Sequence, residues 1–187
     1  MKPIMRDFPF EFETERLTIR GPLPGDGTAV REAVLESQTE LKEYMPWAVD
    51  IPNEEEYETL IREGHLRFLE RKDLWMLLFL KGTNIVVGSS GFHRINWSVP
   101  RFEIGYWVRT SFARQGYITE STKALTEFAF DVLGAKRVEI RCDVLNKRSA
   151  AIPQRLEFTL EGILKHDSRN HLTNELRDTM VFAKTRE

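Results

Sequence analysis

The sequence has few residues of the kinds that hold metals or form disulfides. It contains one cysteine, Cys142, and four histidines in 187 residues. A single cysteine excludes an intrachain disulfide and suits a reducing compartment. No two histidines have the spacing of metal ligands on a helix, and the cysteine is distant from them in the sequence. We therefore expect no metal site, and we expect Cys142 to be a buried small apolar residue.

Long hydrophobic runs are also missing. The longest, around residues 74–80, is far too short to cross a bilayer. Residues 1–10 mix charges, prolines and phenylalanines, which is unlike the apolar core of a signal peptide. The sequence therefore predicts a cytoplasmic protein without membrane association.

Neither sign of charge is in clear excess. The chain has 27 basic and 29 acidic side chains, for a net charge of −2. A general nucleic-acid-binding protein needs a cationic surface, so this balance argues against that class, although a local basic patch is compatible with it. No repeat, low-complexity segment or linker divides the chain, so we predict one domain over residues 1–187.

The hydrophobic periodicity predicts a mixed α/β fold. Strands are expected over residues 13–20, 74–80, 85–92, 102–109, 137–144, 160–166 and 175–184, and helices over 28–36, 40–47, from 54 onward, 119–133 and 147–156. Asp26 or Thr28 is the expected cap of the first helix, and Asn53 that of the third. If the strands 102–109 and 137–144 share a sheet, the helix between them makes a right-handed parallel crossover.

A candidate anion site lies between the strand 102–109 and the helix that follows it. Gly116 allows a sharp turn there and close approach of the backbone to a ligand. The N–H groups of the loop and of the first helical turn, together with the helix dipole, would attract a phosphate, and Arg114 would add a cation. The local sequence is equally compatible with a simple turn between a strand and a helix.

Two motifs carry a resemblance to a known family. Residues 106–125, YWVRTSFARQGYITESTKAL, resemble the acetyl-CoA motif of the GNAT superfamily, Gln/Arg-x-x-Gly-x-Gly/Ala, with Gly116 as the central glycine. Ala113 and Ile118 depart from that pattern. The run from Asn146 to Gly162 resembles the Asn-x-x-Ser…Leu-Gly-Phe-x-x-Glu-Gly signature of the RimJ/RimL branch, which acetylates ribosomal proteins; Glu157 replaces its usual glycine.

The resemblance covers residues 13–184 and includes Glu15-Arg16-Leu17, Arg20 and Met45-Pro46-Trp47. It implies a GNAT fold: a twisted, mostly antiparallel mixed sheet with a central splayed parallel pair and helices on both faces. The implied cofactor is acetyl-CoA, bound by Trp107, Val108, Arg109, Arg114, Gln115, Gly116, Tyr117, Ile118, Thr119 and Asn146.

The resemblance also suggests catalytic and acceptor-site residues. Ser149 is the candidate that protonates the departing thiolate, with an ordinary first-turn helix residue as the alternative. Glu103 is the candidate general base, with a salt-bridged strand residue as the alternative. Glu120 is better explained by the helix dipole than by catalysis. Trp47 is the candidate acceptor-site residue.

The implied reaction is acetyl transfer to a primary amine. Deprotonating an α-amine at pH 7 costs about 1.4 kcal/mol, against about 4.6 kcal/mol for a lysine. The absence of an obvious base therefore favours a protein N-terminus, such as that of a ribosomal protein, over lysine. A small-molecule amine and a non-catalytic acyl-CoA-binding module remain alternatives, and the oligomeric state, a homodimer included, stays open.

Overall fold

The computed structural model describes residues 2–186 and contains one eight-stranded sheet. Its strand order is β1-β2-β3-β4-β5-β6-β8-β7. The strands are β1 Glu11–Glu13, β2 Leu17–Arg20, β3 Leu74–Leu80, β4 Val86–Asn96, β5 Arg101–Val108, β6 Arg137–Asp143, β7 Thr159–Arg169 and β8 Leu176–Thr185. The helices are α1 Gly27–Leu41, α2 Glu54–Leu69, α3 Tyr117–Asp131 and α4 Lys147–Arg155, with short 3-10 turns η1 Pro3–Met5, η2 Pro46–Ala48 and η3 Thr110–Phe112. No helix in the described range is long and apolar enough to cross a membrane.

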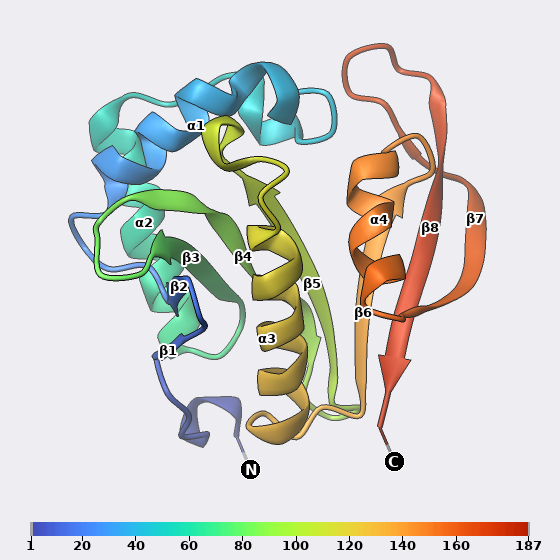
Figure 1. Ribbon diagram of the computed structural model, residues 1–187, viewed down its shortest axis with the longest axis horizontal. Helices are drawn as coiled ribbons and strands as arrows, with labels where there is room; N and C mark the ends of the chain where they lie inside the picture. Colours follow the sequence, from blue (N-terminus) through green and yellow to red (C-terminus); the bar gives the residue numbers. More distant parts are fainter. Residues whose placement is uncertain (1, 187) are drawn as a thin grey trace.

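Helices cover both faces of this sheet (Figure 1). On one face, Leu125 and Phe128 of α3 pack against Phe102 and Ile104 of β5, within the larger hydrophobic core. On the other face, α1 and α2 enclose a second core with β3 and β4. Apolar layers therefore pack against β3 and β4 from both sides of the sheet.

The strands β5 and β6 form a parallel pair that separates along its length. They pair only at Arg101↔Arg137, Phe102↔Val138 and Glu103↔Glu139, whereas every other neighbouring pair of strands in the described sheet is antiparallel. Beyond Glu103 the two strands continue to Val108 and Asp143 without pairing, and they diverge towards these ends (Figure 1). The structure thus confirms the splayed parallel pair inside a mostly antiparallel sheet.

The N-terminal helices differ in part from the expectation. Asn53 caps α2 as predicted, and it forms a reciprocal capping box with Glu56. The expected helix 28–36 extends to Leu41 as α1, whereas the expected helix 40–47 is wrong: a turn follows α1, and then the short 3-10 turn η2 at Pro46–Ala48. Asp26 makes no capping bond, because both of its carboxylate oxygens accept hydrogen bonds from Arg20 at 2.7 Å.

The end of α4 carries a strained residue, as the departure from the family signature predicts. Glu157 has a φ of 57°, in the left-handed region that disfavours residues with a Cβ. We expect Glu157→Gly to stabilise the protein by about 1 kcal/mol, which raises Tm by about 2–4 °C. Calorimetric unfolding would measure this, with Glu157→Ala as the matched control. A Glu157→Ala variant as stable as Glu157→Gly would show that the side chain, and not backbone strain, is responsible.

Candidate active site

The loop before α3 presents a cluster of free backbone N–H groups. Arg114 and Gly116 both have positive φ, at 62° and 84°, so the chain turns sharply into the helix. The first helical hydrogen bond runs from the N–H of Glu120 to the carbonyl of Gly116. The N–H groups of the residues between them therefore have no acceptor within α3, and they point out of its N-terminal end. This geometry can bind an anion.

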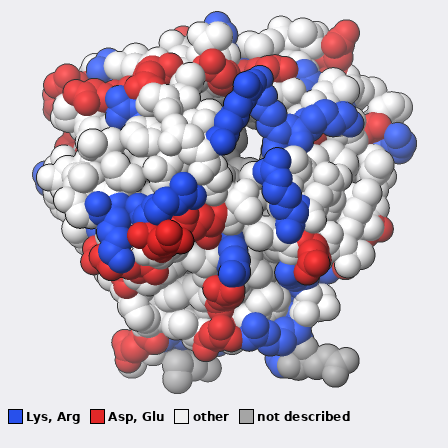
Figure 2. Space-filling view, viewed as in Figure 1, with Lys and Arg blue, Asp and Glu red and all other residues white. Residues whose placement is uncertain are grey.

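The surface around this helix end is hollowed and basic. Arg114, Gln115 and Gly116 are exposed, whereas Tyr117 and Ile118 are buried. A hollow lies between the N-terminal end of α3 and α4, and Lys and Arg side chains surround it (Figure 2). A negatively charged group would be attracted to this position by both the helix end and the side chains.

Arg16, between β1 and β2, fixes the loop before α3. Its Nε donates to Glu120 at 2.7 Å, one terminal nitrogen donates to the carbonyl of Gln115 at 3.0 Å, and its guanidinium lies 4.3 Å from the ring centre of Tyr117. Thr14 Oγ1 also donates to Glu120, at 2.6 Å. This role of Arg16 was not predicted from the sequence. The sequence features that relate to this role are the Glu15-Arg16-Leu17 resemblance and the acidic residue in the first turn of α3.

The Glu120 carboxylate is stabilised by these contacts. Burial alone would raise its pKa, but the hydrogen bonds from Thr14 and Arg16 outweigh burial and lower the pKa below its usual 4.5. A lowered pKa in the folded state contributes stability above the unfolded value, and that contribution is lost as the pH falls through the folded pKa. Glu120 therefore stabilises the loop at neutral pH and does so less in acid.

We expect Glu120→Gln to destabilise the protein by about 1 kcal/mol at pH 7 and to match the wild type more closely as the pH falls below 4.5. Denaturant unfolding across this pH range would measure both effects. Glu127→Gln, on the exposed side of the same helix, is the control. A constant difference between the wild type and Glu120→Gln at every pH would contradict the assigned contacts.

Helix α1 holds the turn that links β5 to this loop. Glu36 accepts hydrogen bonds from the guanidinium of Arg109 and from the N–H of Ser111, the latter at 2.9 Å. The buried Ser37 accepts from the N–H of Thr110 at 2.9 Å. The side chain of Arg109 is therefore engaged with α1, so only its backbone is available at the open end of β5.

Ser149 and Asn146 lie at the start of α4, across the opening from β5. Asn146 Oδ1 accepts a hydrogen bond from the N–H of Ser149 at 3.0 Å, which caps α4. The side-chain nitrogen of Asn146 takes no part in this capping bond. The hydroxyl of Ser149 donates to Tyr106 Oη at 3.2 Å, and Tyr106 donates to the Ser149 carbonyl at 2.9 Å. Burial raises the pKa of Tyr106 well above its usual value, so the phenol stays protonated.

Cys142 is buried, as expected. Burial raises the pKa of its thiol, which keeps it neutral and unreactive.

Trp47 and Glu103, two further predicted residues, lie on the opposite face of the sheet. Trp47 is 44% exposed, and its ring centre lies 6.2 Å from that of Trp107. Glu103 forms an ion pair with Arg94 at 3.0 Å and has a side chain that is only 15% exposed. Because strand residues alternate between faces, Glu103 lies on the opposite face from Tyr106, at the end where β5 and β6 still pair. The structure does not bring Glu103 and Ser149 together.

A backbone anion site at the mouth of two diverging parallel strands is the arrangement of an acyl-CoA-dependent acyltransferase. The sequence profile described as "Acetyltransferase (GNAT) domain" matches residues 16–159, and the chain belongs to this family. The predicted family, fold and enzyme class, an N-acetyltransferase using acetyl-CoA, are thereby confirmed.

Several relatives act on ribosomal proteins. The ribosomal-protein-serine acetyltransferase of Escherichia coli (strain K12) is 28% identical over 153 residues, which is 82% of this chain and 83% of the relative. RimL, a ribosomal L7/L12 alpha-N-protein acetyltransferase solved in complex with coenzyme A, is 25% identical with a TM-score of 0.84, and the match covers 95% of this chain and 96% of RimL. The Salmonella typhimurium acetyltransferase that modifies the N-terminal serine of L7/L12 is 26% identical with a TM-score of 0.79, covering 93% and 97% of the two chains.

Proposed function

We propose that this enzyme transfers the acetyl group of acetyl-CoA to the N-terminal α-amine of a protein, with a ribosomal protein as the first candidate. The observation that carries the proposal is the row of free N–H groups at the start of α3, beside the open ends of β5 and β6. A diphosphate fits such a row because its oxygens accept several hydrogen bonds at once.

The residues around the opening fit an extended coenzyme. The N–H groups from Gly116 to Thr119 would hold the diphosphate, with Arg114 and Gln115 beside it. Backbone groups of Trp107, Val108 and Arg109 would hydrogen-bond the pantetheine amides as an added strand does. The amide nitrogen of Asn146 would donate from the α4 side. An acetyl thioester would then lie between β5 and β6, near the N–H of Val108, which is the candidate donor to its carbonyl oxygen.

Ser149 is the proposed proton donor to the departing sulfur. Its hydroxyl is placed by Tyr106, whose own proton is directed to a carbonyl and is held firmly by burial. Glu103 stays a proposed base from the sequence, although Arg94 already occupies one of its oxygens. Trp47 and Trp107 would line the entry of the acceptor on the opposite face.

An N-terminal acceptor is supported by the named activities of the relatives and by the small cost of deprotonating an α-amine. The test is a thiol-release assay with acetyl-CoA and a panel of amines: peptides with different N-termini, the same peptides with blocked N-termini and an internal lysine, and small amines. We expect turnover of free N-termini only. Turnover of a small amine alone would favour the small-molecule alternative, and tight acetyl-CoA binding without any turnover would favour a binding module.

We further propose that the enzyme acts as a single domain in the cytoplasm. The eight strands form one continuous sheet, and a chain with a single cysteine forms no intrachain disulfide, which suits a reducing compartment. These features support both assignments.

A further inference from the structure

The face of the sheet that carries Glu103 and Trp107 also carries a histidine–carboxylate pair that was not predicted from the sequence. His93 lies on β4, directly across from Glu103 of β5. Its Nδ1 lies 2.7 Å from Asp73 Oδ2, and the two side chains are 36% and 28% exposed. Both groups are therefore held in place by each other and remain reachable by a ligand.

Gly105 leaves room for this imidazole against β5. A Cβ at position 105 would lie 3.1 Å from His93 Cδ2 and 3.4 Å from Nε2. The edge of the ring that carries Nε2 therefore lies over β5, on the face that Glu103 and Trp107 share. When Asp73 accepts the proton of Nδ1, the lone pair of the imidazole is at Nε2, on the side of β5.

A carboxylate that orients an imidazole in this way is a common arrangement for a general base. Glu103 is the competing candidate on the same face, but its Oε2 accepts a hydrogen bond from Arg94 at 3.0 Å.

We propose that His93, oriented by Asp73, accepts the proton of the acceptor amine; this inference rests on the proposed acetyl transfer. The amine nitrogen forms a bond to the thioester carbonyl carbon, and the carbon–sulfur bond breaks. The proton leaves the nitrogen for His93 Nε2 through a chain of water molecules, because the ring lies over Gly105, three residues along β5 from Val108. The sulfur leaves with the electron pair and takes the proton of Ser149, which regains a proton from solvent water as His93 releases its proton to solvent.

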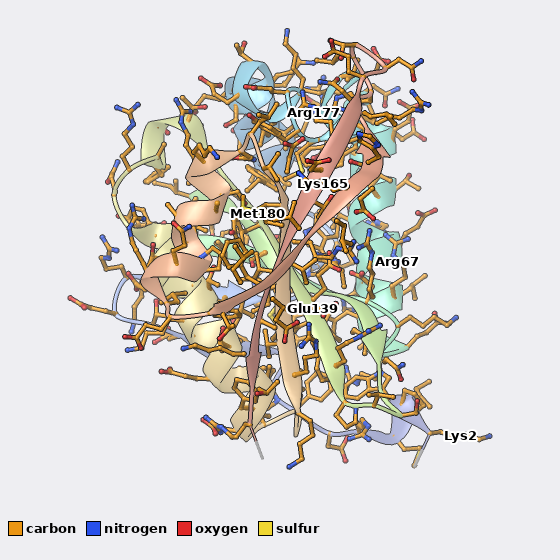
Figure 3. All side chains as sticks on the ribbon, turned by 90° about the vertical axis from the view of Figure 1, so that its right-hand side faces the viewer. Lys2, Arg67, Glu139, Lys165, Arg177 and Met180 are labelled. Carbon is orange, nitrogen blue, oxygen red and sulfur yellow. The ribbon has the colours of Figure 1, made fainter. Side chains whose placement is uncertain are left out.

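Several charged side chains lie on the same face of the sheet as His93. Asp73 precedes β3, Arg94 follows His93 on β4, and Glu103 lies opposite on β5. Arg67 of α2 and Glu139 of β6 lie on the same side of the sheet, opposite α3 and α4 (Figure 3). Glu139 is itself paired with Arg137 at 2.8 Å. Asp73 is therefore the charge whose removal should affect His93 most directly.

Three measurements on His93→Gln and Asp73→Asn test the proposal, with His166→Gln on the exposed strand β7 as the control. Steady-state kinetics from pH 5.5 to 9 should show kcat/KM reduced about 100-fold in His93→Gln, with the fall in rate at low pH abolished. The dissociation constant of acetyl-CoA should stay within about 2-fold in calorimetry, since His93 lies on the other face of the sheet. In Asp73→Asn, an NMR titration of the His93 ring should move to lower pH while His166 is unchanged.

Several results would overturn the inference. One is a His93→Gln enzyme that keeps the wild-type rate and pH profile. Another is loss of the acidic limb in Glu103→Gln and not in His93→Gln. A third is an NMR titration midpoint of the His93 ring that is the same in Asp73→Asn as in the wild type. Wild-type protein that acetylates no amine would instead remove the proposed function, and the inference with it.

Discussion

Gly116→Val should weaken acetyl-CoA binding about 10-fold or more. Gly116 has a φ of 84°, and a β-branched residue there is a conformational outlier that costs about 1–2 kcal/mol or forces the loop into another shape. Each 1.4 kcal/mol is a factor of 10 in affinity. The neighbouring N–H groups would then no longer point to one position. The free energy lost should therefore be that of binding the diphosphate of acetyl-CoA. Isothermal titration with acetyl-CoA would measure it.

Gly134→Val provides a matched control. Gly134 also has a positive φ, 70°, it follows the opposite end of α3, and a Cβ at this position would meet no other atom within 4 Å. The backbone strain is therefore similar, but the anion site is a helix length away. We expect Gly134→Val to lose stability while keeping acetyl-CoA affinity. Equal losses of affinity in the two variants would mean that general destabilisation, and not loop geometry, controls binding.

Ser149→Ala should lower kcat about 100-fold and leave acetyl-CoA affinity unchanged. The substitution removes the proposed proton donor, but it retains the carbonyl that accepts from Tyr106 and the N–H that Asn146 caps. The local structure should therefore survive, and the loss should appear in turnover alone. Stopped-flow detection of free thiol, with saturating acetyl-CoA and peptide, would measure kcat.

Ser149→Thr is the conservative companion of this variant, since it keeps a hydroxyl at the same position. It should recover most of the lost rate. If Ser149→Ala turned over as fast as the wild type, Ser149 would be only a first-turn helix residue. If Ser149→Thr were as slow as Ser149→Ala, the hydroxyl itself would not explain the loss.

Local signals in the sequence predicted much of this architecture. Asn53 followed by acids marks a helix start, because a side-chain cap and the helix dipole act over a few neighbouring residues. The strand–glycine–helix order around Gly116 likewise predicts the candidate anion site, since backbone N–H groups would supply it whatever side chains the residues carry. The departures at Ala113 and Ile118 accordingly leave the turn intact.

The contacts that complete the site join residues far apart in the chain, so periodicity could not reveal them. Arg16 and Glu120 are separated by 104 positions, and His93 and Asp73 by 20. Arg20 competes for the Asp26 carboxylate, which is why Asp26 does not cap α1. The order and register of the strands determine which of these residues meet, and a local sequence pattern does not reveal that order or register.

The most direct test of the account is to follow the backbone amide signals of the protein by NMR while coenzyme A is added. We predict that the N–H signals of Gly116, Tyr117, Ile118 and Thr119 shift strongly with coenzyme A and hardly with pantetheine, which has no diphosphate. Pantetheine should affect only Trp107 to Arg109 and the start of α4. Strong shifts confined to another surface, or identical shifts at Gly116 with both compounds, would contradict diphosphate binding at the start of α3.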